Sequence, residues 1–269
     1  MTKNVLDDIL RSKREEIAQL SARPCETRLD GARPRGAAVV STLARRRGEP
    51  LRLLTEIKRR SPSAGPLSTV LSVGERALAY ARAGASMISV LCDGPFFDGG
   101  WAHVVEARRA LDAAGLSVPV LAKEFVLDER QIEEAAACGA DGVLLIVRIV
   151  EHARLPSLVA RARAAGLEPL VEVVSEEELS AALDADAKVI GVNARDLDTL
   201  VMDAARAARV LAAIPKDRVA VHLSGLKGPD DVAAVAESSA DAALMGEALM
   251  RQDDPTALLE AMLNAARRG

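Results

Sequence analysis

The chain has 269 residues, of which 49% are hydrophobic and 28% are charged, so it can bury a core and is not intrinsically disordered. Its net charge of −4 and its 2% of aromatic residues argue against a nucleic-acid-binding surface. No stretch approaches the roughly 18 apolar residues of a membrane span, and the N-terminus lacks the apolar core of a signal peptide. The three cysteines have no paired spacing, which indicates a reducing compartment. We therefore expect a cytoplasmic protein that binds neither nucleic acid nor a membrane.

The first 50 residues precede the first strand-like run of the sequence. Residues 3–20 have the pattern of an amphipathic helix, and 22–36 are rich in proline and glycine and are expected to form a loop. Residues 37–47 are expected to form a second short helix, with the basic run 45–47 as its solvated end. About 45 residues with few large apolar groups would be marginal on their own. We interpret this part as an extension that packs on the following domain.

Eight short apolar runs follow, and Ala-, Arg- and Glu-rich helical patterns separate them. Most of the runs are uniformly apolar, as expected of parallel strands that are buried on both faces. Several helical stretches end at a glycine, and Ser175 with Glu178 three positions later predicts a capping box. The predicted strands are 51–57, 86–92, 118–125, 142–147, 168–174, 188–193, 218–224 and 242–246.

This repeated order of strand and helix predicts an α/β protein, a (β/α)8 TIM barrel with an N-terminal helical extension. We expect one barrel domain over residues 1–269, with the extension at 1–50 and eight βα units at 51–269. A doubly wound parallel sheet is the structural alternative. Such a sheet usually has fewer strands and often a glycine-rich first turn, and no G-x-G-x-x-G motif follows any predicted strand here.

Charged residues stand near the ends of the first, third and fifth predicted strands. Glu56 and Lys58 are two positions apart and so share one face, while Lys123 and Glu172 interrupt aliphatic runs. One such residue is more often a structural ion pair than a catalyst. Inward residues of a barrel layer come from alternate strands, so these four are expected to meet at the C-terminal mouth. Two lysines and two carboxylates there predict an acid–base site.

The last two predicted strands are followed by Gly225 and Gly246. Barrels of this kind commonly bind phosphate at this place, through backbone N–H groups and a helix N-terminus. Each glycine alone is weak evidence, because left-handed turns also need one. Together with Lys58 and Ser61 from the first unit, the two glycines predict a site for a phosphate monoester.

Three motifs are specific: E-x-K-x-x-S-P-S in 56–63, K-x-F in 123–125 and G-x-N-x-R-x-L in 191–197. With them the chain resembles the indole-3-glycerol-phosphate synthases, which are barrel enzymes of the tryptophan pathway. The resemblance covers strands one to eight in order. The matching segments are 56–65, 89–100, 120–147, 170–179, 189–197, 223–232 and 244–255.

The resemblance implies a carboxy-lyase that closes the ring of 1-(2-carboxyphenylamino)-1-deoxyribulose 5-phosphate with loss of CO2 and water, without a metal or an organic cofactor. It implies that Lys123 is the general acid and Glu172 the acid/base carboxylate, and that Glu56 and Lys58 assist dehydration and bind substrate. Asn193 joins this catalytic set. The substrate and its phosphate would be bound by Ser61, Arg195, Ser224, Gly225, Gly246 and Glu247. The aromatic ring would lie against Pro62, Phe97, Phe125 and Leu144. We expect a monomer, and association with other enzymes of the pathway stays open.

The sequence departs from the family pattern at Leu223, where the family usually has an active-site glutamate. Ala122, Glu124 and Ala194 also differ from the usual residues. The acid–base set is kept, which predicts catalysis, whereas Leu223 predicts an altered rate or substrate preference. The second hypothesis is a weakened paralogue of the same barrel family that acts as a binding or pathway-complex subunit. The isomerase of the same pathway is a third hypothesis, but its Cys/Asp pair is not found near strands one and seven.

Overall fold

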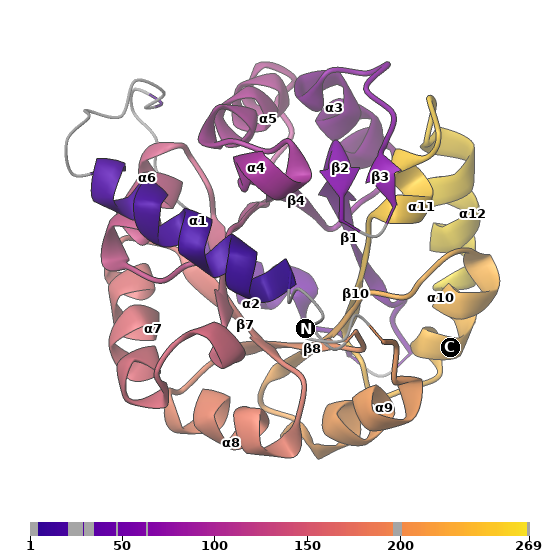
Figure 1. Cartoon of the computed structure of the whole chain (residues 1–269). Coiled ribbons are helices and arrows are strands. Elements are labelled where there is room, and N and C mark those ends of the chain that lie inside the picture. Colours follow the sequence, from indigo (N-terminus) through magenta and orange to yellow (C-terminus); the bar gives the residue numbers. More distant parts are fainter. Residues whose placement is uncertain are drawn as a thin grey trace.

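The computed structural model describes residues 5–20, 29, 35–46, 48–62, 64–195 and 201–267. These residues form a closed barrel of parallel strands with helices around it (Figure 1). Around the barrel the strands follow the order β1-β10-β9-β8-β7-β6-β5-β4. The closed sheet confirms the predicted TIM barrel and excludes the doubly wound alternative.

Each strand of the barrel coincides with one of the predicted apolar runs. The strands are β1 (Arg52–Ile57), β4 (Met87–Leu91), β5 (Val120–Lys123), β6 (Gly142–Ile146), β7 (Glu168–Val173), β8 (Val189–Asn193), β9 (Val219–Leu223) and β10 (Ala242–Met245). Two further short strands, β2 (Arg60–Ser61) and β3 (Gly65–Pro66), pair antiparallel in the loop after β1.

The helices around the barrel alternate with its strands. They are α3 (Val73–Ala83), α4 (Gly94–Phe97), α5 (Trp101–Ala113), α6 (Glu129–Ala137), α7 (Leu155–Ala164), α8 (Glu176–Asp184), α9 (Ala204–Ala213), α10 (Pro229–Ala236), α11 (Glu247–Met250) and α12 (Thr256–Ala265), with 3-10 turns η1 (Val147–Ile149) and η2 (His152–Arg154). None of the described helices has the length and hydrophobicity that a membrane-spanning helix needs.

Only half of the capping box predicted at the start of α8 is present. The Ser175 side chain accepts a hydrogen bond from the Glu178 N–H at 3.2 Å. The Glu178 carboxylate, however, accepts from the Val174 N–H at 2.8 Å, and it also pairs with Arg148 at 3.0 Å. The prediction of a full box was therefore wrong, because the partners of Glu178 lie outside the capping position.

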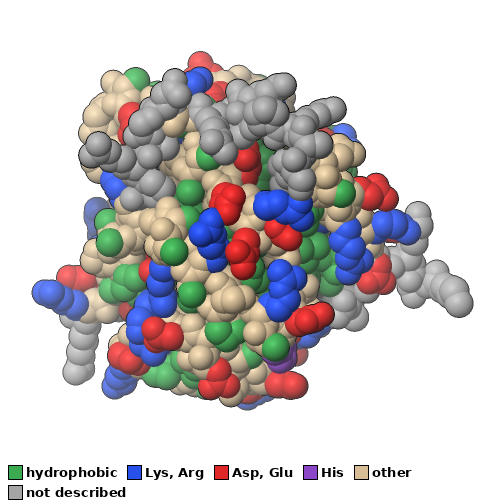
Figure 2. All heavy atoms as spheres, turned by 90° about the vertical axis from the view of Figure 1, so that its left-hand side faces the viewer, with side chains coloured by type: hydrophobic (Ala, Val, Ile, Leu, Met, Phe, Trp, Pro, Cys, Tyr) green, Lys and Arg blue, Asp and Glu red, His purple; other side chains and the backbone are tan. Residues whose placement is uncertain are grey.

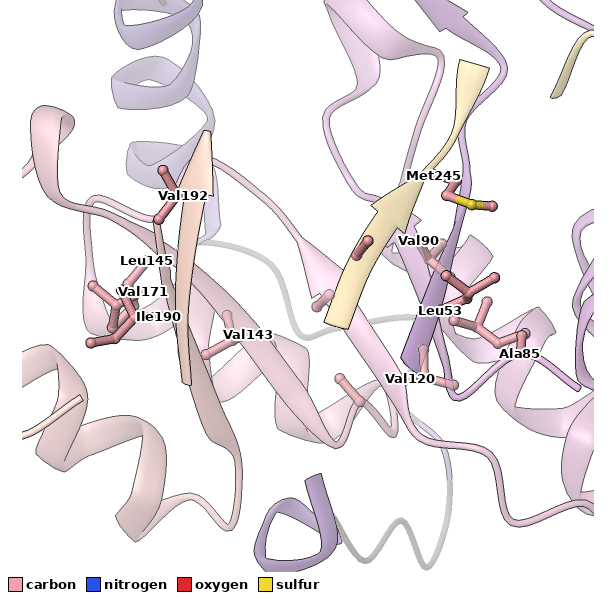
Figure 3. Close-up of a cluster of buried hydrophobic side chains, with 14 of the residues drawn as sticks. Leu53, Ala85, Val90, Val120, Val143, Leu145, Val171, Ile190, Val192 and Met245 are labelled. Atoms are coloured by element: carbon pink, nitrogen blue, oxygen red, sulfur yellow. The ribbon is translucent and has the colours of Figure 1, made fainter. Parts of the chain in front are cut away.

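The period of two along each strand divides the core into two layers. Outward residues such as Leu53, Val90 and Leu145 pack between the strands and the helices (Figure 3). Inward residues such as Leu54 and Leu170 fill the barrel interior. Because both faces of the strands are buried, the strands are largely apolar in sequence.

The N-terminal extension supplies two helices that lie at opposite ends of the barrel. Helix α1 (Val5–Leu20) crosses in front of the barrel in Figure 1, and its residues Leu6 and Ile9 line the cavity at the C-terminal mouth. Helix α2 (Gly36–Leu43) lies at the other end, where Val39 and Leu43 pack into the inner core. The extension thus closes the bottom of the barrel and covers part of its mouth.

The predicted second helix, 37–47, was too long. Helix α2 ends at Leu43 because Ala44 takes an extended backbone with φ −60° and ψ 138°. Arg45 is not part of a solvated helix end: its N–H donates to Asp241 Oδ1 at 3.1 Å, and its guanidinium donates to the carbonyl of Ala236 at 2.9 Å. Arg47 and most of the predicted loop 22–36 lie outside the described residues, and residue 36 itself begins α2.

Figure 2 shows the side of the barrel that lies to the left in Figure 1. Lys and Arg side chains are mixed there with Asp and Glu side chains. Arg161 and Glu133, for example, form an ion pair between α7 and α6. Among the described residues, this face therefore shows no continuous positive surface of the kind that binds a nucleic-acid backbone.

Candidate active site

A cavity of about 550 Å³ opens at the C-terminal ends of the barrel strands. Every residue that the sequence analysis assigned to the site lines this cavity. They are Glu56, Lys58, Ser61, Pro62, Phe97, Lys123, Phe125, Leu144, Glu172, Asn193, Arg195, Ser224, Gly225, Gly246 and Glu247. Within the described part of the chain, no group of three or more His, Cys, Asp or Glu side chains is arranged to hold a metal ion.

The strand alternation explains why these polar side chains meet. Glu56 lies two positions after the inward core residue Leu54, and Glu172 lies two positions after Leu170. Each polar residue therefore occupies the next inward layer above the apolar core. The layer lies at the mouth because it is the last inward position of the strand.

Glu56 stands at the centre of the charged cluster. Its Oε1 lies 2.7 Å from Lys58 Nζ, and its Oε2 lies 3.2 Å from Lys123 Nζ. The Glu56 side chain is only 4% exposed. Burial raises the pKa of this carboxyl group, but the two ammonium groups lower it by more than burial raises it. The resulting pKa is about 2. Glu56 is therefore an anion throughout the neutral pH range.

Lys123 and Glu172 have pKa values that differ from those of exposed side chains. Burial lowers the pKa of Lys123, but the carboxylates of Glu56 and Glu172 raise it above its ordinary value of 10.5. Burial also raises the pKa of Glu172, and Lys123 and Asn193 offset only part of this effect. The pKa values of the two carboxyl groups are thus shifted in opposite directions. Glu56 is fixed as an anion, whereas Glu172 is the carboxyl group suited to exchange a proton.

Asn193 connects the ends of three neighbouring strands. Its Nδ2 donates to Glu172 Oε1 at 2.9 Å, and its Oδ1 accepts from Ser224 Oγ at 2.8 Å and from the Arg195 N–H at 3.0 Å. Ser224 has φ +78°, an unusual conformation for a residue other than glycine. Such strain persists where surrounding contacts hold it, and the bond to Asn193 is one of them.

Gly225 and Gly246 lie in the predicted phosphate site, and a larger residue is disfavoured at each position for a different reason. Gly225 has φ +91°, in the left-handed region that favours glycine. Gly246 has φ −133°, which other residues adopt, but a Cβ there would overlap Glu56 Oε1. Both glycines lie along the cavity with Lys58 and Ser61. Their role in binding an anion remains a prediction.

The predicted aromatic wall comes from the loops after β4 and β5. Phe97 is the last residue of α4, and Phe125 follows β5. Their ring centroids are 6.0 Å apart and their planes are tilted by 35°, a favourable arrangement for two aromatic rings. Leu144 and Pro62 line the same cavity. The pocket thus has an apolar part beside its charged cluster.

Leu223 occupies the inward layer beside the polar residues. It pairs in register with Asn193 on β8 and with Leu244 on β10. The side chain is 2% exposed and packs over Gly191, where any larger residue would meet it. A leucine at this position therefore extends the apolar core of the barrel up to the cavity.

Helix α1 carries a buried lysine, Lys13, that was not predicted from the sequence. Leu6, Ile9, Lys13 and Ile17 are spaced by three or four residues, so they share one helix face, and all four are buried. A lysine within such an apolar stripe was the available signal, because this position normally holds an apolar residue. Lys13 forms ion pairs with Asp93 and Glu124, which follow β4 and β5.

Comparisons with known proteins agree over nearly the whole chain. The family model "Indole-3-glycerol phosphate synthase" matches residues 6–262. The chain is 41% identical to indole-3-glycerol phosphate synthase 1 of Streptomyces coelicolor, covering 94% of this chain and 92% of that protein. It is 43% identical to the indole-3-glycerol phosphate synthase of Kineococcus radiotolerans, covering 93% and 92%.

Among solved structures, the fold is similar to thiamine phosphate pyrophosphorylase from Pyrococcus furiosus, with a TM-score of 0.60 and 18% identity. That alignment covers 80% of this chain and 95% of the other. At this identity the likeness concerns the barrel fold alone.

Proposed function

The chain belongs to the indole-3-glycerol phosphate synthase family, and we propose that the cavity at the mouth of its barrel carries the family's reaction. Family membership makes it a carboxy-lyase of tryptophan biosynthesis. The substrate implied by the resemblance is 1-(2-carboxyphenylamino)-1-deoxyribulose 5-phosphate. One observation carries the assignment to this cavity: Glu56 contacts both Lys58 and Lys123 there, beside an apolar wall.

Ring closure needs a proton donor at the ketone oxygen of the substrate. The ring carbon that bears the carboxylate attacks the ketone carbon, and the oxygen takes up a proton as the new bond forms. Lys123 is suited to this step because Glu56 and Glu172 keep it protonated. A raised pKa also makes it a weaker acid, so its position close to the oxygen has to supply much of its efficiency.

Loss of CO2 and of water completes the aromatic product. The CO2 leaves from the ring carbon, and the hydroxyl leaves as water after it is protonated. A base then removes a proton so that the five-membered ring becomes aromatic. We assign the base to Glu172, whose pKa is raised by burial, and we assign Glu56 with Lys58 to assisting the dehydration. A cavity that excludes water strengthens all these electrostatic interactions.

The two ends of the substrate would be held by different parts of the cavity. We assign the phosphate to the end of β1 and to the loops after β9 and β10, where Gly225 and Gly246 lie with Lys58 and Ser61. The remaining polar contacts would come from Arg195, Ser224 and Glu247. We assign the aromatic ring to the wall formed by Phe97 and Phe125 with Pro62 and Leu144.

Leu223 is the observation that favours the second hypothesis, a weakened paralogue. A usual active-site carboxylate is replaced by a buried leucine, whereas the costly charges of Glu56, Lys123 and Glu172 are kept. Drift toward a purely structural role would remove buried charges first, because they destabilise a fold that no longer uses them. The retained charges therefore favour an active enzyme.

The decisive experiment is to incubate the purified chain with the carboxyphenylamino-deoxyribulose phosphate and to follow the indole product by absorbance or fluorescence. Turnover would support the enzyme, and binding without turnover would support the weakened paralogue. Size-exclusion chromatography with light scattering tests the monomer that we propose. We place the reaction in the cytoplasm, which agrees with the free, buried thiols of Cys92 and Cys138.

A further inference from the structure

A second charged cluster is buried beneath α1, beside the proposed active site. Lys13 Nζ lies 2.9 Å from Asp93 Oδ1 and 3.1 Å from Glu124 Oε1. It also lies 2.7 Å from a carboxylate oxygen of Glu16 on the same helix. The side chains of Lys13, Asp93 and Glu124 are 1%, 0% and 2% exposed. Lys13 is therefore more deeply buried than the lysines of the acid–base cluster, since Lys58 and Lys123 are 15% and 19% exposed.

Docking of α1 alone does not explain a lysine at this position. Its neighbours on the same face, Leu6, Ile9 and Ile17, are apolar and pack on the barrel. An apolar residue at position 13 would extend this stripe without desolvating a charge. A buried charge network is costly, and one use of it is to fix a single arrangement of the parts that it joins. The parts joined here are the segments that carry Asp93 and Glu124.

Both carboxylates also accept hydrogen bonds from backbone N–H groups in the segments that carry Phe97 and Phe125. Asp93 is the N-cap of α4, and its Oδ2 accepts from the Phe96 N–H at 2.9 Å. The same four-residue helix ends with Phe97. Glu124 Oε1 accepts from the Phe125 N–H at 2.7 Å. One ammonium group thus links the two loops that carry Phe97 and Phe125, whose rings lie 6.0 Å apart.

We propose that Lys13 is a positioning residue for the ring closure: by joining Asp93 to Glu124 it sets the spacing of Phe97 and Phe125 and seats α1 over the aromatic part of the cavity. The proposal rests on the proposed function, because the aromatic ring is that of the assigned substrate. Helix α1 contributes to the same cavity through Val5, Leu6 and Ile9.

The phosphate end of the cavity is built on other elements. Gly225 and Gly246 follow β9 and β10, and Lys58 follows β1. The ion-pair partners of Lys13 in the described part of the chain are Glu16, Asp93 and Glu124, which belong to α1 and to the ends of β4 and β5. Loss of Lys13 is therefore expected to weaken the ring end of the cavity and to leave the phosphate end intact.

Two variants separate positioning from folding. Lys13→Met leaves two buried carboxylates without their cation, so this variant is at risk of not folding. The double variant Lys13→Met/Glu124→Gln removes one cation and one anion together, and its glutamine keeps an oxygen that can accept from the Phe125 N–H. The matched control is Arg11→Met on the same helix, because Arg11 is 67% exposed and pairs with Asp8 away from the barrel.

The experiment measures dissociation constants for two probes and steady-state kinetics. The first probe is a substrate analogue whose ketone is reduced to an alcohol, so that it cannot cyclise, and the second is inorganic phosphate. We expect the folded Lys13 variants to bind the analogue about tenfold or more weakly, with KM raised more than kcat is lowered. We expect phosphate binding within about twofold of the unsubstituted chain, and unchanged values for Arg11→Met.

Three results would overturn the proposal. The folded double variant could bind the analogue as tightly as the unsubstituted chain, or lose affinity for both probes equally, which would indicate a general structural effect. A double variant that does not fold would assign Lys13 to folding instead. Failure of the proposed function is a separate result, because it is the absence of product from the unsubstituted chain, whereas the binding measurements need no turnover.

Discussion

Gly246 lies directly against Glu56, so that a methyl group at position 246 would overlap Glu56 Oε1 and come within 3.1 Å of its Cβ and Cδ. The carboxylate is thus enclosed by the backbone at the end of β10 on one side and by the ammonium groups of Lys58 and Lys123 on the other. A position that the sequence analysis assigned to phosphate binding therefore also shapes the acid–base cluster.

The first prediction concerns Gly246→Ala. The new methyl group should displace the end of the Glu56 side chain and lengthen its contact with Lys58, which lowers kcat/KM by on the order of 10²-fold. The free energy of unfolding should fall too, because the displaced carboxylate is buried and paired with Lys58 and Lys123. Gly228→Ala is the control, since Gly228 has open space around its Cα and no positive φ. Equal activity of the two variants would show that Glu56 does not need its present position.

The second prediction concerns the assigned general acid. Lys123→Ala should lower kcat by on the order of 10²-fold or more, because the ketone oxygen loses its proton donor. Lys188→Ala is the control, since Lys188 is half-buried and pairs with Asp186 at the opposite end of the barrel. An unchanged kcat in Lys123→Ala would refute the assignment.

The sequence located the main cluster because two simple rules apply to it. Inward residues alternate along a strand, and function gathers at the C-terminal strand ends, which together identify Glu56, Lys58, Lys123 and Glu172. Both rules act within one strand, so they need no knowledge of which segments meet in space. The close approach of Gly246 to Glu56 joins β10 to β1, and no local pattern predicts it.

For Lys13 the sequence indicates burial but does not indicate which residues it contacts. Its place in an apolar stripe indicates burial, but the sequence does not say what the stripe packs against. The partners Asp93 and Glu124 come 80 and 111 positions later in the chain. The capping box predicted from Ser175 and Glu178 was wrong for a related reason. The spacing was right, but the Glu178 carboxylate binds Val174 and Arg148 instead.

The third prediction uses the hydrogen bond between Asn193 and Glu172. This bond favours the ionised carboxylate and so lowers the pKa of Glu172 against the effect of burial. In Asn193→Ala the pKa of Glu172 should rise further, and the acid limb of kcat/KM against pH should move to higher pH. Asn264→Ala, an exposed substitution on α12, is the control. An acid limb that stays in place would mean that Glu172 does not set it.

The fourth prediction concerns stability against pH. The pKa of Glu56 is about 2 in the folded chain and 4.5 ordinarily, so its ionised form contributes stability above about pH 4.5 that is lost as the pH falls toward about 2. Urea unfolding should therefore show a large difference between the unsubstituted chain and Glu56→Gln at pH 6, shrinking as the pH is lowered. Glu260→Gln, on an exposed part of α12, should show no comparable convergence. A difference that is constant from pH 6 to pH 3 would contradict the low pKa.

The fifth prediction concerns Leu223. Leu223→Glu would place a carboxylate in the inward layer next to Asn193, in the cavity that holds both lysines. An opposite charge nearby favours the protonated form of a lysine, so the pKa of Lys123 should rise further and the basic limb of kcat/KM should move to higher pH. Stability should fall by about 2–4 kcal/mol, because Leu223 packs over Gly191 and the new carboxylate is buried.

Leu223→Gln separates charge from packing in this test, because it has the shape of the glutamate without its charge. If the basic limb moves in Leu223→Glu and not in Leu223→Gln, the charge at position 223 tunes the cluster. Glu56 contacts both Lys58 and Lys123, so the shifted basic limb reports the titration of the cluster as a whole and not of one lysine. A basic limb that stays in place or moves down with the glutamate would mean that residue 223 does not tune the site. The leucine would then be a neutral replacement that the barrel core tolerates, because it is buried and packs over Gly191.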